Sequence, residues 1–232
     1  MNLHTALSSL LIGLILSLFG VQSPSQKESV ITVISGSIEG TAILAPKNRP
    51  VRFGGGLYGR SAPSASSQSS SDSILVVLKG TPSNIASESA SYFLNQKDQQ
   101  FVPSLLAVKL GGMVRIQNSD PVYHNVFSLT SPHKFDVGRR PKGEHFDVTF
   151  EKPGVVDVFC DIHSNMHAII YVLPENAVAW TKIKSGDTFS FSDIEDGSYE
   201  LTLYALGYQE STSQIDVQSG QTYQTGTITL NP

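Results

Sequence analysis

Hydrophobic and polar residues alternate with a period of two along much of the chain, a pattern that predicts β-strands with unlike faces. Residues 27–44 begin with such alternating β-formers and predict one or two strands. The compact apolar run ILVVLK at residues 74–79 predicts a buried strand. Further strands are predicted over residues 146–150 and 168–173. The pattern therefore indicates an all-β protein.

Two segments of strand-like sequence, LLAVKL at Leu105–Leu110 and MVRIQN at Met113–Asn118, flank the pair Gly111 and Gly112. Such an arrangement is typical of a β-hairpin, here with Val114 and Ile116 facing inward. Residues 85–92 lack this alternation and predict weakly helical or irregular structure.

The strand predicted over residues 155–160 places its side chains on two faces. Val156, Val158 and Cys160 share one face, and Asp157 lies on the other. The alternation therefore predicts that Cys160 points into the core.

The C-terminal part of the chain has a different texture, with short strands separated by turn signals and without His, Cys or Met. It predicts a small β-sandwich. The expected organisation has four parts: a signal peptide at 1–23, an N-terminal β segment at 24–80 with a Ser/Gly-rich loop at 54–73, a site-bearing β-domain at 81–174, and the C-terminal sandwich at 175–232.

The first 23 residues contain the short apolar run Leu10–Phe19, followed by small residues before Ser23. The surrounding segment Ala6–Val21 is too short for a comfortable membrane span, which needs about 20 apolar residues. It predicts a cleaved signal peptide and a periplasmic or secreted protein, with no transmembrane helix in the mature chain. The alternative is an uncleaved N-terminal anchor.

Composition narrows the possible partners. The chain of 232 residues is 40% hydrophobic and 16% charged, with a formal net charge of −4. A net negative charge makes nucleic acid an unsuitable partner and disfavours binding to anionic membrane surfaces.

The single cysteine is the centre of the candidate chemistry. An exported chain with one cysteine cannot form an internal disulfide, so its thiol is expected to be buried or metal-bound. Cys160 is followed by His163 and Met166, and His124 lies upstream in the run DPVYHNVF. A thiolate, two imidazoles and a thioether are the ligands of a blue-copper centre.

These motifs carry a family resemblance. The segments FEKPGVVDVFCDIHSNM and NSDPVYHNV resemble the cupredoxins, the plastocyanin and azurin superfamily, and the spacing C-x2-H-x2-M is similar to that of amicyanin. The resemblance implies a Greek-key β-sandwich or barrel holding one mononuclear copper ion that cycles between Cu(I) and Cu(II). It implies His124, Cys160 and His163 as equatorial ligands and Met166 as the axial ligand. It also implies that Asn125 ties the two ligand segments together by hydrogen bonds.

The ligand loop departs from the family pattern at two positions. Ser164 stands where many relatives have proline, which is expected to loosen the loop and shift the reduction potential. His167 directly follows Met166, and we interpret it as a solvent-exposed or strand-start residue, the alternative being a role beside or in place of Met166. We expect His133 and His145 to be solvated rather than ligands.

A wider resemblance covers the other parts of the chain. The stretch DGSYELTLYALGY, residues 196–208, is similar to the carboxypeptidase-regulatory-like sandwich. The whole chain resembles exported methylamine-utilisation-type proteins that join such a module to a cupredoxin.

The resulting hypothesis is a type 1 copper protein that carries one electron between exported redox partners, such as a cytochrome or a dehydrogenase, with His163 as the exit. The alternative is copper storage, delivery or sensing with the same residues. No enzymatic activity is expected, because a copper oxidase or nitrite reductase would need a second, His-rich site and the chain has six histidines. A dinuclear CuA centre would need two cysteines. A scaffold for adhesion with a vestigial site is disfavoured by the intact ligand set.

Overall fold

The computed structural model describes residues 35–47, 72–81 and 91–232, and these residues form β-strands and connecting loops with no α-helix among them. The prediction of an all-β fold is confirmed. The predicted signal peptide at 1–23 and nearly all of the Ser/Gly-rich loop lie outside the described residues. Within the part of the chain that is described, no helix is long and apolar enough to cross a membrane.

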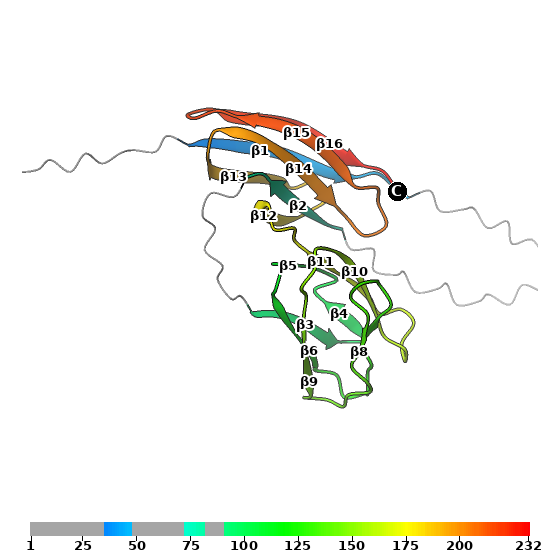
Figure 1. The fold of residues 1–232 in the computed structure, drawn as a ribbon. Helices are drawn as coiled ribbons and strands as arrows, with labels where there is room; N and C mark the ends of the chain where they lie inside the picture. The colour runs from blue at the N-terminus through cyan, green and yellow to red at the C-terminus, as the bar shows by residue number, and fades with distance from the viewer. Residues whose placement is uncertain (1–34, 48–71, 82–90) are drawn as a thin grey trace, which may run out of the picture. The chain divides into compact units, whose positions relative to one another are not determined.

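One group of strands, here called the inner sandwich, consists of the strands from β3 to β11 (Figure 1). One of its sheets has the order β4-β3-β6-β9 and the other has the order β5-β11-β10-β7-β8. The strands are β3 (Ser91–Lys97), β4 (Gln100–Val102), β5 (Leu105–Val108), β6 (Met113–Asn118), β7 (Phe127–Ser128), β8 (Phe135–Asp136), β9 (His145–Thr149), β10 (Gly154–Phe159) and β11 (His167–Val172).

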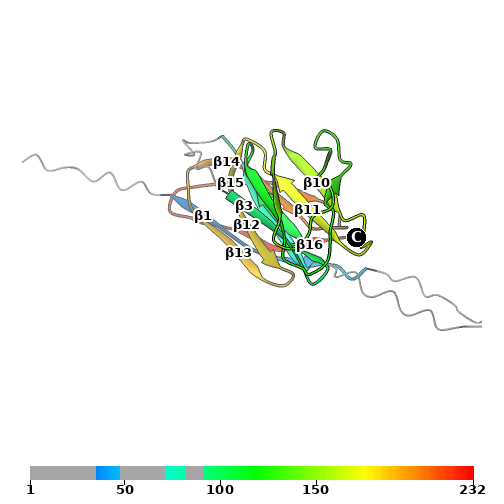
Figure 2. The same cartoon turned by 90° about the horizontal axis from the view of Figure 1, so that it is seen from below.

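The second group, here called the terminal sandwich, takes strands from both ends of the chain. In Figure 1 the blue strand β1 lies among orange and red strands, and Figure 2 shows it beside β13. Its sheets have the orders β13-β1-β16 and β12-β2-β14-β15. The strands are β1 (Gly36–Leu44), β2 (Ser73–Lys79), β12 (Ala177–Lys184), β13 (Thr188–Ile194), β14 (Gly197–Tyr204), β15 (Ser211–Val217) and β16 (Thr222–Leu230).

The N-terminal strands therefore pair with the C-terminal module, a question that the sequence left open. β1 pairs antiparallel with β13 and parallel with β16, and β2 lies between β12 and β14. Both faces of β2 are buried, and this explains its uninterrupted hydrophobic sequence. Ile74, Val76 and Leu78 lie in the core of the terminal sandwich, and Leu75 and Val77 lie in a separate cluster with Leu105, Ile169 and Tyr171 of the inner sandwich.

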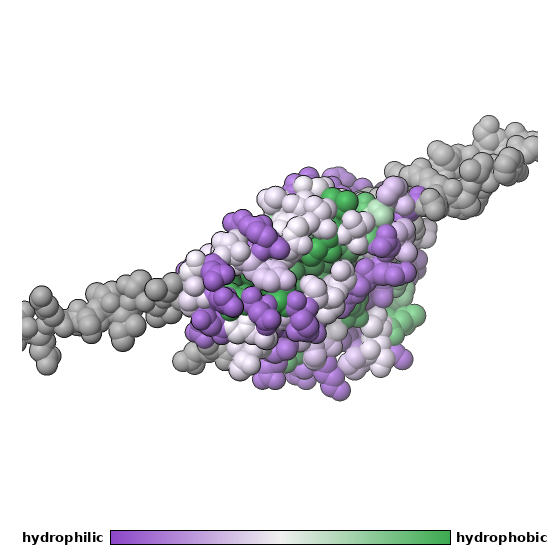
Figure 3. Space-filling view, turned by 90° about the horizontal axis from the view of Figure 1, so that it is seen from above, coloured by the Kyte–Doolittle hydropathy of each residue, from purple (hydrophilic) through white to green (hydrophobic). Residues whose placement is uncertain are grey.

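Strands β15 and β16 of the terminal sandwich expose mostly polar side chains. Several strand positions of β15 and β16 are exposed and polar, whereas Ile215, Val217 and Leu230 are buried. Figure 3 shows one face of the molecule as a mosaic of hydrophilic and hydrophobic residues.

Two predictions about strands were wrong. The runs around Gly111 and Gly112 do not form a hairpin, because β5 pairs with β11 in one sheet whereas β6 lies between β3 and β9 in the other. The glycine pair carries the chain from one sheet to the other, and Gly111 has a φ of +76° that suits glycine. Val114 and Ile116 are nevertheless buried, as predicted.

The prediction of helical or irregular structure for residues 85–92 is wrong at its last two positions, because Ser91 and Tyr92 belong to β3. Residues 82–90 lie outside the described part of the chain. Polar Asn95 and Gln96 within β3 hide its strand character, although Leu94 and Gln96 are buried.

We expect Ile38→Ala in β1 to lower the free energy of unfolding of the terminal sandwich by about 2–5 kcal/mol, because the side chain is fully buried in its core. Glu39→Ala is the matched control, since Glu39 lies on the exposed face of the same strand and should change the value by less than about 0.5 kcal/mol. Urea unfolding followed by circular dichroism measures both. Equal stability of the two variants would contradict the placement of β1 in this core.

Candidate metal centre

Two features position Cys160: the alternation of side chains along β10 and the end of the β10–β11 hairpin. Val156 and Val158 of β10 are fully buried in the core of the inner sandwich, and Cys160, just beyond the strand, is 5% exposed in the same core. The predicted inward direction of Cys160 is confirmed. β10 and β11 pair antiparallel up to Phe159 opposite His167. The residues between these two, Cys160 to Met166, form the loop that connects the strands.

The connecting loop is held in a compact shape by its own backbone. The N–H of Met166 donates to the carbonyl of His163 at 3.0 Å, and the N–H of Cys160 lies 3.4 Å from the carbonyl of Met166. Met166 is 1% exposed and lies in the same hydrophobic cluster as Cys160. Its role as an axial ligand stays a prediction.

His124 comes from a different part of the chain and lies in a loop, three residues before β7 (Phe127–Ser128). Its backbone N–H donates to the carbonyl of Arg140 at 3.2 Å, and its carbonyl accepts from the N–H of Arg140 at 2.7 Å. These two bonds hold the fully buried histidine in place.

The structure brings His124, Cys160 and His163 together, with one potential ligand atom of each within 4.8 Å of the others. The Sγ of Cys160 lies 3.8 Å from Nδ1 of His124 and 3.9 Å from Nδ1 of His163, and the two Nδ1 atoms are 3.0 Å apart. Two atoms that bind one metal ion at about 2.0–2.3 Å lie within about 4.6 Å of each other. All three distances meet that condition, so this group could hold a single metal ion.

Asp120 determines which nitrogen of His124 faces the group. Its Oδ2 lies 2.8 Å from Nε2 of His124. Burial by itself would raise the pKa of Asp120, but hydrogen bonds from the N–H of Gln99, the ring of His124 and the N–H of Asp98 outweigh it and lower the pKa below its ordinary value. An ionised carboxylate only accepts hydrogen bonds, so Nε2 of His124 carries a hydrogen, and in the neutral ring the lone pair is then on Nδ1, the nitrogen that faces Cys160.

The family resemblance implied a supporting hydrogen bond from Asn125, but its buried Oδ1 has no hydrogen-bond partner among the described residues. The fully buried Asn118 makes such bonds instead. Its Nδ2 donates to the carbonyls of Val122 and Arg140 at 2.8 and 2.9 Å, and its Oδ1 accepts from the N–H of Asp120 at 2.8 Å. Asn118 and Asp120 precede a proline in the run NSDP, which suggests a turn but not a buried polar network.

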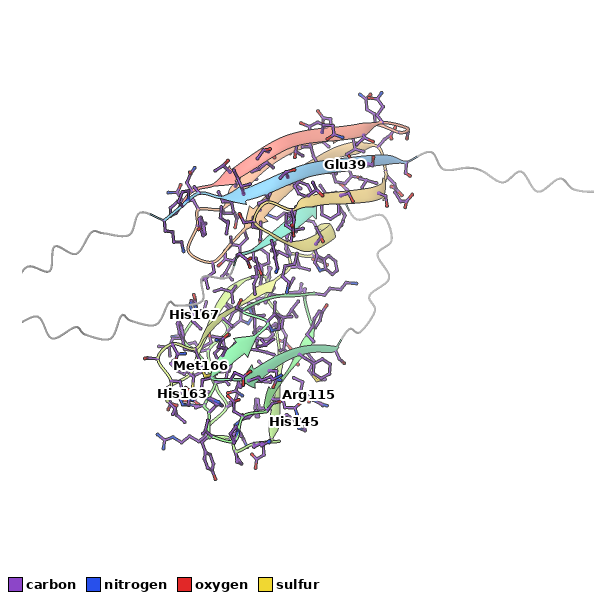
Figure 4. All side chains as sticks on the ribbon, turned by 180° about the vertical axis from the view of Figure 1, so that it is seen from behind. Glu39, Arg115, His145, His163, Met166 and His167 are labelled. Atoms are coloured by element: carbon purple, nitrogen blue, oxygen red, sulfur yellow. The ribbon has the colours of Figure 1, made fainter. Side chains whose placement is uncertain are left out.

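The remaining histidines of the described chain lie elsewhere. His167 begins β11, its Nε2 lies 2.8 Å from Oδ1 of Asp157, and its ring stacks on Phe159 at 4.5 Å. It is thus a strand-start residue on the face of the sheet opposite to Ala168, as interpreted from the sequence. His133 contacts the carbonyl of Lys152, and His145 is exposed in β9. Figure 4 labels His145, His163, Met166 and His167 on the ribbon.

A surface depression adjoins the group. It has a volume of about 520 Å³ and is lined by Val122, Tyr123, Arg139, Ile162 and His163. Val122, Tyr123 and Ile162 are 40%, 59% and 38% exposed. Half-buried His163 thus touches both the buried donor group and a largely apolar surface.

Comparisons with known proteins agree with a β-sandwich at the C-terminal end but not with the expected module. Residues 173–225 match the family model of polysaccharide lyase family 4, domain II. The expectation of a carboxypeptidase-regulatory-like module is therefore wrong, because the family model that matches is the polysaccharide lyase domain. The match omits β1 and β2, which complete the terminal sandwich. No curated protein matches the sequence.

Among solved structures, the chain is similar to a Cu-containing nitrite reductase from Thermus scotoductus SA-01, at 24% identity and a TM-score of 0.36, over 41% of this chain and 25% of that chain. An oxidized amicyanin variant is 21% identical over 36% of this chain and 82% of that chain, with a TM-score of 0.34. A purple cupredoxin from Nitrosopumilus maritimus is 22% identical over 35% of this chain and 99% of that chain, with a TM-score of 0.32. The chain thus spans a quarter of the nitrite reductase.

We expect His163→Gln to weaken the binding of one Cu²⁺ ion by at least about 100-fold, because it removes one of three donor atoms. His167→Gln should leave the affinity within about twofold, since its ring contacts Asp157 and Phe159 and not the donor group. Competition titration against a chelator measures both affinities. A comparable loss in both variants would mean that His167 is itself a ligand.

Proposed function

We propose that this chain is an exported type 1 copper protein that carries single electrons between other redox proteins. The observation that supports the proposal is the group of two imidazole nitrogens and one thiol sulfur, all within 3.0–3.9 Å of each other. Two histidines and a cysteine in one plane, with a weak methionine beside them, are the donors of blue-copper electron-transfer sites. The apolar run at residues 10–19 supports export.

The donor set fits copper in its chemistry. A thiolate and a thioether are soft ligands that favour Cu(I), and imidazole suits both oxidation states. In this chain Cys160 and Met166 are buried at 5% and 1% exposure, so their sulfur atoms are shielded from water. A buried thiolate is costly without a positive partner, and a bound cation removes that cost. Copper, when bound, supplies the one-electron Cu(I)/Cu(II) couple.

The surface around His163 supports transfer to another protein. Val122, Tyr123 and Ile162 expose apolar surface beside the one ligand candidate that reaches the depression. Interface centres are enriched in aromatic and apolar residues and depleted in charge. A cytochrome or dehydrogenase docked there would come closest to the donor group at His163. We propose that the chain itself catalyses no reaction.

Cys160→Ser should abolish the intense visible band that thiolate coordination gives to Cu²⁺ in the loaded wild-type protein, because serine offers no sulfur. Absorption and EPR spectra of both proteins measure the change. The absence of the band from the wild type, or its persistence in the variant, would contradict the proposal.

Ile162→Lys should slow electron self-exchange at least about tenfold, because two copies meeting at this surface would bring added positive charges together beside Arg139. The visible band of the copper-loaded Ile162→Lys variant should remain that of the wild type. Tyr223→Lys in β16 is the control, because it places the same charge on the terminal sandwich. Line broadening in NMR spectra of mixed Cu(I) and Cu(II) protein gives the rate.

An unchanged rate in Ile162→Lys would exclude this surface as the exit. Slow self-exchange in the wild type, together with rapid loss of copper to an acceptor, would instead favour copper storage or delivery.

A further inference from the structure

Asp120 joins the turn at residues 98–99 to the segment that carries His124. Its Oδ1 accepts from the backbone N–H of Asp98 at 2.6 Å, and its Oδ2 accepts from the backbone N–H of Gln99 at 2.9 Å. The same Oδ2 accepts from Nε2 of His124 at 2.8 Å. Asp120 is 5% exposed. One buried carboxylate therefore accepts three hydrogen bonds, from a β-turn and from a ligand candidate.

The turn that Asp120 binds has a backbone conformation that is unusual for Asp and Gln. Asp98 and Gln99 connect β3 to β4, and both have a φ of 55°, in the left-handed region that side chains other than glycine disfavour. Left-handed central residues are typical of two-residue hairpin turns, which usually contain Asn-Gly. Here the two N–H groups of the turn point at one carboxylate, which helps to hold this conformation.

The same turn also touches the ligand loop. Nδ2 of Asn165, next to Met166, lies 3.3 Å from the carbonyl oxygen of Gln99. The turn thus accepts a hydrogen bond from the loop that carries Cys160 and His163, and donates two to the residue that holds His124. It is a structural link between the two segments that supply the donor atoms.

We propose that Asp120 is the positioning residue of this centre: it orients His124, couples it through the Asp98–Gln99 turn to the ligand loop, and biases the site toward Cu(II). This inference rests on the copper function proposed above. A hydrogen bond to an ionised acceptor is stronger than a neutral one, and partners of a metal-bound histidine raise the basicity of the ring. A negative charge in a poorly solvated position beside a ligand stabilises the more highly charged metal ion.

Asp120→Asn tests the inference with little change of size. The amide offers one acceptor oxygen and an NH₂ donor in place of two acceptor oxygens, so at least one of the three donors loses its acceptor, and the negative charge is lost. We expect the Cu(II) affinity to fall about 10–100-fold and the Cu(I) affinity to fall less. A tenfold change in the ratio of the two affinities corresponds to a rise in reduction potential of about 59 mV.

Asp147→Asn is the matched control. Asp147 pairs with Arg115 at 2.9 Å on the neighbouring strands β6 and β9, so its substitution removes one negative charge without touching a ligand candidate. Chelator competition for Cu(II) and Cu(I), with voltammetry, measures both variants. A change in the affinity ratio of Asp120→Asn no larger than that of Asp147→Asn overturns the inference. Loss of the visible band in the wild type would refute the copper function instead.

Asn165→Ala tests the coupling even if Asp120→Asn does not fold, because Asn165 is exposed and its substitution leaves the core intact. Loss of its bond to Gln99 should speed the release of copper to a chelator about tenfold. Asn176→Ala, the same change at an exposed position outside the ligand loop, should release copper at the wild-type rate. Equal release rates in Asn165→Ala and the wild type overturn the coupling of the loop to the turn.

Discussion

The antiparallel pairing of β10 with β11 is the constraint on which the candidate centre depends. It ends where Phe159 faces His167, so Cys160 to Met166 must close the hairpin in one short loop. Alternation then puts Val158 and Cys160 on the core side, and Phe159 and His167 together on the other. The same register explains why the imidazole next to Met166 stays away from the donor group.

The second half of the centre has no strand to position it and relies on buried polar groups. His124 sits in a loop, where the backbone of Arg140 and the side chain of Asp120 hold it. Asn118 joins these pieces through bonds to two carbonyls and to the N–H of Asp120. Buried polar groups of this kind stabilise a unique geometry only when they are satisfied, which this network largely achieves.

The sequence predicted those features that depend on local pattern. The inward direction of Cys160, the run of β2 and most C-terminal strands follow from alternation and turn signals. It failed where pairing is set by distant partners. Gly111 and Gly112 suit a hairpin locally, but β5 and β6 each find partners in different sheets. Asp120 carries no local signal of its role, because that role arises only when the turn at residues 98–99 folds against it.

The topology explains how one chain combines the two sandwiches. Lys79 at the end of β2 pairs with Ala177 at the start of β12, so the chain leaves and re-enters the terminal sandwich at neighbouring points. The inner sandwich is thus inserted between two adjacent strands of the other. Insertion is tolerated where the ends of the inserted domain lie close together. A division of the sequence into consecutive segments separates β1 and β2 from the strands that they pair with, because the residues of the inner sandwich lie between them in the sequence.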